Sequence, residues 1–204
     1  TCVQVIRTGH TTQNTPLSRI GDTLMFRLTT AVMAIFLFSM AATVQADRLL
    51  DPMPSSMVAN DFSLPDLTGK QHQLKDFKGG FTLVNFWTKD CTICRAEFAT
   101  MNDLQAQLQD SYDFKVVAIH AGGKPEEVEK VLVTNPVEFT VLMDLNLELG
   151  SWGVPTLPTS YLIAPNGSFA YRAVGTRIWN SPVMVDFLRR IFDEYQQEQA
   201  LSQN

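Results

Sequence analysis

Two cysteines separated by two residues offer the clearest chemistry in this sequence. Cys91 and Cys94 form a C-x-x-C pair, whereas the third cysteine, Cys2, lies far away near the N-terminus. The pair stands between an apolar run and a helical pattern, so we expect Cys91 at a helix N-terminus, where a thiolate is stabilised. On a helix, residues three apart share a face. Cys91 would attack the disulfide of a partner protein, and Cys94 would resolve the mixed disulfide.

The same two thiols have other uses that the sequence leaves open. Zinc binding is disfavoured, because one C-x-x-C supplies half of a tetrahedral site and neither His72 nor His120 has a paired ligand spacing. Two thiols can hold Cu(I), although no methionine cluster adjoins them. They could also be unreactive core residues. We predict no metal ion and no cofactor beyond a redox-active disulfide between the two cysteines.

Periodic patterns on both sides of the pair predict the elements that position it. The nearly continuous apolar run at 81–87 is typical of a strand buried on both faces, which implies helices on either side. After Cys91, apolar residues at three- and four-residue steps predict one helix of about four turns. Residues 62–73 suggest a small hairpin. Further strands are expected at 114–120, 139–143, 160–164 and 168–174, and further helices at 125–133 and 181–197.

These elements predict an α/β fold with a central mixed sheet flanked by helices and a short N-terminal β-hairpin extension. Forty-five per cent of the 204 residues are hydrophobic, as expected for one globular domain with an additional segment. Sixteen Lys and Arg against 21 Asp and Glu give a net charge of −5. This balance is too acidic for a protein that follows nucleic-acid backbones, so we expect no nucleic-acid partner.

An uncharged apolar run at 28–44 predicts export or membrane attachment. A basic residue precedes the run, and Val44 and Ala46 have the spacing of a signal-peptide cleavage site, so we expect cleavage after Ala46. The alternatives are a retained membrane anchor, because the run is at the lower edge of the roughly 17–25 residues that span a bilayer, or a buried core helix. Export would place the cysteine pair in an oxidising periplasmic or other extracytoplasmic compartment.

The remaining segments suggest where the domain begins and ends. If Met25 starts a signal peptide or anchor at 25–46, residues 1–24 are upstream sequence from a misplaced start, or part of a fragment. Residues 47–60 are rich in Met, Pro and Ser, which predicts a linker or an arm on the surface. The domain itself is expected at 61–198, with a C-terminal tail at 199–204.

Several blocks of the chain resemble the TlpA/ResA branch of the thioredoxin superfamily. They read FSLPDLTGKQHQLKDFKGGFTLVNFWTKDCTICRAEF, WGVPTLPTSYLIAPNGS and YRAVG, and they extend from about Asp61 to the last helix. The resemblance implies a thioredoxin fold, an active-site C-x-x-C and a facing cis-proline loop. That loop would be Leu157, Pro158 and Thr159, which would bind the partner. Trp87 would pack beside the active site and contribute to binding, with plain core packing as the alternative.

Glu97 matches the acidic residue that follows the second cysteine by three positions in ResA-like proteins. On a helix it would share a face with Cys94, where a carboxylate could take the proton of the resolving thiol. A solvated helix glutamate is the alternative. Asn85 stands where thioredoxins proper carry a buried aspartate, so Glu97 is the only plausible substitute for that acid. His120, at the end of a buried strand, is expected to be structural rather than a base.

Residues around the cysteines are expected to tune the redox chemistry, namely Lys89, Asp90, Thr92 and Ile93. The family usually has a neutral residue where Asp90 stands and a proline where Ile93 stands. The charge of Asp90 should raise the pKa of Cys91, whereas Lys89 and the helix dipole should lower it. A less stabilised reduced form makes a more reducing couple, so we expect a reductant.

The leading functional hypothesis is an exported thiol–disulfide oxidoreductase that reduces a cysteine pair in another protein, such as apocytochrome c before haem attachment. Electrons would come from a membrane donor of the DsbD/CcdA type, because the surrounding compartment is oxidising. A peroxidase of the peroxiredoxin type is an alternative: Thr88 fits that pattern, but Val84 occupies the position of its proline. A non-enzymatic copper or haem carrier using the same thiols also stays open.

Overall fold

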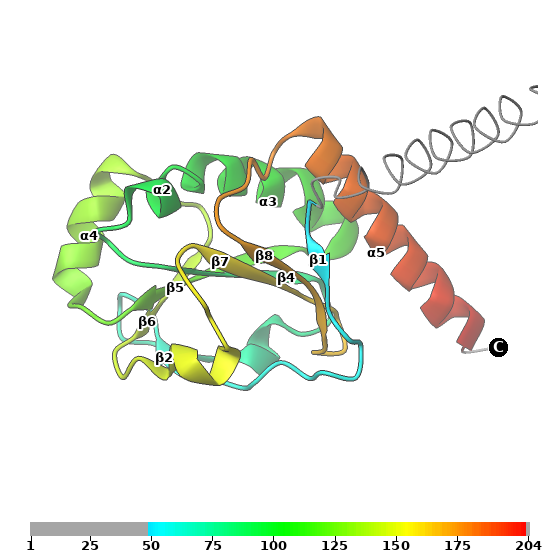
Figure 1. The fold of residues 1–204 in the computed structure, drawn as a ribbon, viewed down its shortest axis with the longest axis horizontal. Helices are drawn as coiled ribbons and strands as arrows, with labels where there is room; N and C mark the ends of the chain where they lie inside the picture. The colour runs from blue at the N-terminus through cyan, green and yellow to red at the C-terminus, as the bar shows by residue number, and fades with distance from the viewer. Residues whose placement is uncertain (1–48, 203–204) are drawn as a thin grey trace, which may run out of the picture. The chain divides into compact units, whose positions relative to one another are not determined.

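Figure 1 shows the computed structural model, which describes residues 49–202. The expected signal peptide or anchor and the segment upstream of it, residues 1–46, lie outside the described residues. The chain from Leu49 onward forms a compact unit of its own. Within 49–202, no helix combines the length and the apolar character needed to cross a membrane.

Six strands build the central sheet. They are Asp51–Pro52 (β1), Thr82–Trp87 (β4), Lys115–Ala121 (β5), Thr140–Asp144 (β6), Thr159–Ile163 (β7) and Phe169–Val174 (β8). Their order is β1-β8-β7-β4-β5-β6. β4, β5 and β6 run parallel, whereas β7, β8 and β1 pair antiparallel, so the predicted mixed sheet is confirmed. β4 lies between β7 and β5 in the interior of the sheet, and all six of its residues are buried, as its apolar run predicted.

Different elements pack against the two faces of the sheet. One face packs against three helices, α3 (Phe98–Tyr112), α4 (Pro125–Thr134) and α5 (Pro182–Ser202). The other packs against the hairpin β2 (Ser63–Pro65) with β3 (Gln71–Gln73) and the short 3-10 helices η1 (Leu74–Phe77) and η2 (Glu148–Trp152). In Figure 1, α3 lies above the sheet and β2 below it. The expected hairpin is confirmed, but long helices cover only one face.

The helix expected after Cys91 is interrupted. It consists of α2, Thr92–Arg95, and then α3, which begins at Phe98. Between them the Glu97 N–H donates to the Cys94 carbonyl, a three-residue hydrogen bond that tightens the turn before regular α3 bonding begins. Apolar residues at three- and four-residue steps did not reveal this break, because that spacing is nearly kept through it.

The folded unit extends beyond the expected domain limits at both ends. At the N-terminal end, residues 49–60 form an arm rather than a free linker: β1 pairs with β8, Val58 bridges Ser168, and Leu50 is 4% exposed. At the C-terminal end, α5 continues to Ser202, so most of the expected tail is helical. Backbone hydrogen bonds and one buried leucine hold the arm, and neither depends on a periodic pattern that sequence analysis detects.

Candidate active site

The chain segments that carry the expected site leave the sheet at one edge. β4 ends at Trp87, and a short turn then leads to Cys91 at the start of α2. Phe86 in β4 pairs with Thr159, the first residue of the antiparallel β7. The segment before Thr159 therefore lies at the same edge, and its Leu157–Pro158 peptide bond is cis, as the family resemblance implied.

The two cysteines are disulfide-bonded and differ in exposure. Cys91 is half-buried, whereas Cys94 has no exposed surface. Cys91 is the N-cap of α2, and its Sγ accepts the Cys94 N–H at 3.2 Å. Unpaired N–H groups at a helix start stabilise negative charge. The arrangement can therefore present one sulfur to a partner and keep the other in reserve.

Around the pair, the expected tuning residues lie at the surface. Thr92 is exposed, and Ile93 is 55% exposed beside Cys91. The Lys89 ammonium group lies 3.2 Å from the Asp90 carboxylate, which is 83% exposed, and 3.9 Å from Glu127. Because such exposed ion pairs are screened by water, the charge of Asp90 acts on Cys91 only weakly and is partly neutralised.

Glu97 is buried one turn beyond Cys94, with 3% of its surface exposed. Its Oε1 accepts the Arg177 backbone N–H at 2.7 Å and the Trp179 indole N–H at 3.0 Å. Oε2 has no hydrogen-bond partner among the described residues. Burial raises the pKa of Glu97 to about 7, against the opposing effects of the Arg177 and Trp179 hydrogen bonds, the Arg177 charge and, least of all, the nearby Asn85 amide. The alternative of a solvated glutamate is excluded.

The partners of Glu97 come from a segment that sequence analysis did not single out. Arg177 and Trp179 lie between β8 and α5, and Trp179 is fully buried. Arg177 also donates from Nε to the Leu49 carbonyl at 2.9 Å, which ties this segment to the N-terminal arm. A tryptophan in a polar connection was the only available signal, and it does not indicate a partner about 80 residues earlier in the chain.

Asn85 occupies the centre of the sheet below the site. It is fully buried, and its side-chain amide donates to the Ser160 hydroxyl at 2.9 Å. A neutral amide therefore stands at the position where the resemblance indicated an aspartate in thioredoxins proper. Glu97, three residues after Cys94, is accordingly the buried carboxyl group nearest to the cysteines in the sequence.

The residues expected to bind a substrate differ in their exposure. Trp87 is fully buried, with its ring edge-on to Phe98 and to His120, so core packing describes it and it has no surface for a partner. Pro158 and Thr159 are also buried, and the Thr159 hydroxyl donates to the Thr156 carbonyl at 2.8 Å. Of the three residues expected in the cis-proline loop, Leu157 alone keeps partly exposed surface.

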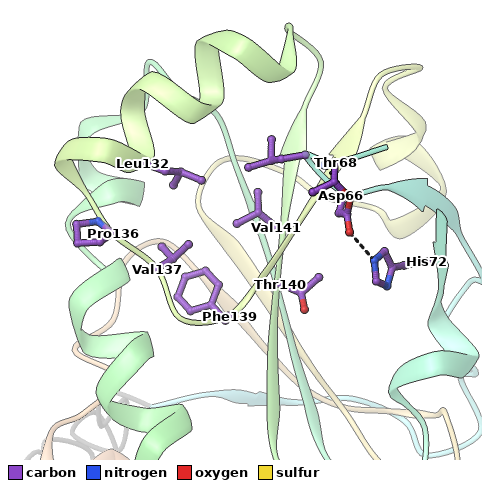
Figure 2. Close-up of a pocket in the computed structure, with 10 residues that line it drawn as sticks. Asp66, Thr68, His72, Leu132, Pro136, Val137, Phe139, Thr140 and Val141 are labelled. Atoms are coloured by element: carbon purple, nitrogen blue, oxygen red, sulfur yellow. Dashed lines mark hydrogen bonds and ion pairs between the residues drawn. The ribbon is translucent and has the colours of Figure 1, made fainter. Parts of the chain in front are cut away.

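A cavity of about 460 Å³ lies elsewhere, beside the edge strand β6. Figure 2 shows Leu132, Val137 and Phe139 on one side of it and the Asp66–His72 pair, 2.9 Å apart, on the other. None of its lining residues belongs to the cysteine site. Within residues 49–202, no group of three or more His, Cys, Asp or Glu side chains is arranged to hold a metal ion.

Comparison with known proteins connects this geometry with a family. Residues 56–172 match the AhpC/TSA family. The thiol-disulfide oxidoreductase ResA of Geobacillus thermodenitrificans is 29% identical over 150 residues, or 72% of this chain and 86% of the relative. The ResA of Bacillus subtilis is 32% identical over 119 residues, or 58% of this chain and 66% of that protein.

Two solved structures are also similar to this chain. A Chlorobium tepidum protein described as a thiol:disulfide interchange protein DsbE has a TM-score of 0.59 and 34% identity, covering 68% of this chain and 94% of that chain. The thioredoxin domain of a Bacteroides vulgatus thiol-disulfide oxidoreductase, at a TM-score of 0.60 and 20% identity, covers 69% and 99% and supports the fold alone. The fold is thus thioredoxin-like, as predicted. With its disulfide-bonded pair at a helix start, the chain belongs to the AhpC/TSA family and is a thiol-disulfide oxidoreductase of the ResA/DsbE type.

Proposed function

We propose that this protein reduces a disulfide in a partner protein outside the cytoplasm. The observation that carries the proposal is the difference between an accessible Cys91 at a helix N-terminus and a fully buried Cys94 with the buried carboxyl group of Glu97 one turn further on. An accessible thiolate can attack a protein disulfide, and a shielded thiol then resolves the mixed disulfide. The substrate class is a protein with a cysteine pair.

The proposed exchange proceeds in two steps that use the two cysteines and Glu97 of the enzyme. The Cys91 thiolate attacks one sulfur of the partner's disulfide, a mixed disulfide forms, and the other partner sulfur leaves as a thiolate. Cys94 gives its proton to the Glu97 carboxylate and attacks Cys91, which releases the second partner sulfur. The enzyme ends with its own disulfide, and two electrons must return from a donor. No cofactor beyond the cysteine pair is needed.

The finer assignments are part of the same proposal. A membrane donor of the DsbD/CcdA type would return the electrons, because an oxidising compartment offers no soluble supply. Export through the apolar segment at 28–44, either cleaved or kept as an anchor, would bring the domain there. Apocytochrome c before haem attachment is the proposed substrate. The apolar run supports the export that this assignment requires.

The test is the reduction potential of the Cys91–Cys94 pair in the purified protein. We expect a value near that of thioredoxin, about −270 mV, whereas a value near that of DsbA, about −120 mV, would make the protein an oxidant. Peroxide consumption and bound copper or haem, measured on the same sample, separate the alternatives. Fast peroxide turnover would revive the peroxidase, and bound metal without a two-electron transition would favour the carrier.

A further inference from the structure

Both ring nitrogens of His120 are engaged by backbone groups. Nε2 lies 2.7 Å from the Lys89 backbone nitrogen, whose N–H donates to it, and Nδ1 lies 2.8 Å from the Gly122 carbonyl oxygen. A carbonyl oxygen can only accept, so Nδ1 carries the hydrogen, and an N–H can only donate, so Nε2 is unprotonated. The contacts therefore select one neutral tautomer and leave no nitrogen free to act as a base.

The surroundings hold this ring in place. His120 is 1% exposed, and its strand position pairs in register with Trp87, whose ring it meets edge-on at 4.7 Å. The turn formed by Gly122 and Gly123 closes over the other side. At Gly123, where φ is +77°, an added Cβ would lie 3.2 Å from His120 Cε1. Only a residue without a side chain fits this turn comfortably, and the imidazole cannot shift far.

The contact to Lys89 matters because this residue lies close to the reactive cysteine in the chain. Residues 88–90 lead directly into Cys91, and three hydrogen bonds hold them: Cys91 N–H to the Thr88 carbonyl at 3.1 Å, Arg95 to the Lys89 carbonyl, and Lys89 N–H to His120. The donors of the first two bonds are Cys91, the next residue in the chain, and Arg95 in α2. The bond to His120 connects it to a neighbouring strand, 31 residues away in sequence.

We propose that neutral His120 is a positioning residue for disulfide exchange: by accepting the Lys89 N–H, it anchors residues 88–90 to β5 and holds Cys91 at the start of α2. The inference rests on the proposed function, because positioning matters only if Cys91 attacks disulfides. It goes beyond that function by assigning a part in the first step to a residue that touches neither sulfur.

Protonation of the ring would remove the anchor. A proton on Nε2 would face the Lys89 N–H with a second donor, and the hydrogen bond would be lost. The charged groups that face the ring are Lys89, Asp90 and Glu127. Burial lowers the pKa of His120 from 6.5, the Lys89 charge lowers it further, and the Gly122 bond and the two carboxylates oppose this. The anchor is therefore intact at neutral pH and is released only in acid.

Two substitutions separate the contacts of His120. His120→Gln places a side-chain oxygen near the position of Nε2, so it keeps an acceptor for Lys89 and loses the donor to Gly122. His120→Asn places an amide near Nδ1, so it keeps the donor to Gly122 and loses the acceptor. Because each variant loses one hydrogen bond, their stabilities should be similar. Thermal unfolding of both variants verifies the match.

The assay uses the reduced protein and a small aryl disulfide that releases a coloured thiolate. The first thiolate reports the attack by Cys91, and the second reports its resolution by Cys94. We expect His120→Asn to slow the first release by roughly threefold to tenfold, the factor expected from one net hydrogen bond, and His120→Gln to stay within about twofold of the parent protein. Equal losses, no loss, or a loss in His120→Gln alone would overturn the proposal.

A second measurement keeps the proposal testable if His120→Asn does not fold. In the parent protein, hydrogen exchange at the Lys89 amide is followed by NMR as the pH falls below 6.5, together with the His120 ring signals. We expect protection to disappear with the midpoint of the ring titration. Protection that persists through this titration would contradict the proposal. A parent protein that fails to react with the aryl disulfide would instead count against the proposed function.

Discussion

At the scale of single residues, the site depends on one carboxyl group whose surroundings change its chemistry. An exposed glutamate is ionised at neutral pH and cannot exchange protons usefully there. Glu97 is buried, and its pKa is raised to about 7 by that burial. Its Oε2, buried without a hydrogen-bond partner among the described residues, is a favourable place for a proton. A group of this kind can both accept and return the proton of Cys94 near neutral pH.

Glu97→Gln should slow the resolving step selectively. The amide has nearly the same shape but cannot accept the proton of Cys94, so the second thiolate release should fall by about a hundredfold while the first stays nearly unchanged. In the parent protein, the second release should accelerate as the pH rises through about 7. The exposed Glu129→Gln on α4 is the matched control. An unchanged second release across pH would remove Glu97 from the mechanism.

Trp179→Phe tests the hydrogen bond that opposes the effect of burial on Glu97. The indole N–H donates to Glu97 Oε1 at 3.0 Å and lowers the pKa of that carboxyl group. Without it, the pKa should rise further, and the pH midpoint of the resolving step should move to higher pH. Trp152→Phe, in the core on the opposite face of the sheet, serves as the control. A midpoint that does not move would show that the indole has no influence on Glu97.

At the scale of elements, the site is assembled from segments that are distant in the chain. The carboxyl end of β4 leads to the cysteines, β5 carries near its end the imidazole that holds Lys89, and the connection from β8 to α5 caps Glu97. The N-terminal arm joins the last of these, because Arg177 donates to the Leu49 carbonyl. An arm outside the expected domain boundary therefore contributes to the support of the site.

Leu50→Ala should show that the arm is part of the folded unit. Leu50 is 4% exposed and packs in the core on the helical face of the sheet. Its truncation should lower the free energy of unfolding by about 2–3 kcal/mol, measured by denaturant titration. Leu201→Ala, at a position that is 78% exposed in α5, is the matched control and should cost less than about 0.5 kcal/mol. Equal effects would mean that the arm does not pack.

At the scale of the domain, one buried acid connects stability with pH. The pKa of Glu97 is 4.5 in a solvent-exposed reference state and about 7 in the folded protein. The folded state therefore holds the proton more tightly, so the stability from Glu97 is fully present below the lower value and is lost as the pH rises to the higher one. Stability and the resolving step thus depend on the same proton.

The pH dependence of unfolding measures this connection. Between pH 4.5 and about 7, the parent protein should lose up to about 3 kcal/mol of unfolding free energy relative to Glu97→Gln, which has no proton to lose. The comparison with Glu97→Gln removes the contribution of other groups, such as His120, whose lowered pKa acts in the opposite direction. Parallel stability curves for the two proteins would contradict a raised pKa.

Local pattern in the sequence predicted those features that depend on neighbouring residues. Cys91 at a helix start, the central strand and the hairpins were recognisable because burial repeats with the period of a strand or helix. The family resemblance added the cis bond before Pro158. The resemblance also indicated Trp87 and Thr159 as binding residues, but it did not reveal that both side chains are buried, because a motif identifies a residue type and not its exposed area.

The tertiary structure decided the features that depend on distant segments. The partners of Glu97 come from 80 and 82 residues away, and the group that holds Lys89 comes from 31 residues away. A pKa depends on desolvation and on hydrogen bonds, and only the folded packing of these segments removes water from Glu97 and His120. The sequence by itself determined which groups could react. The packing determined that Glu97 exchanges a proton near neutral pH and that His120 stays neutral there.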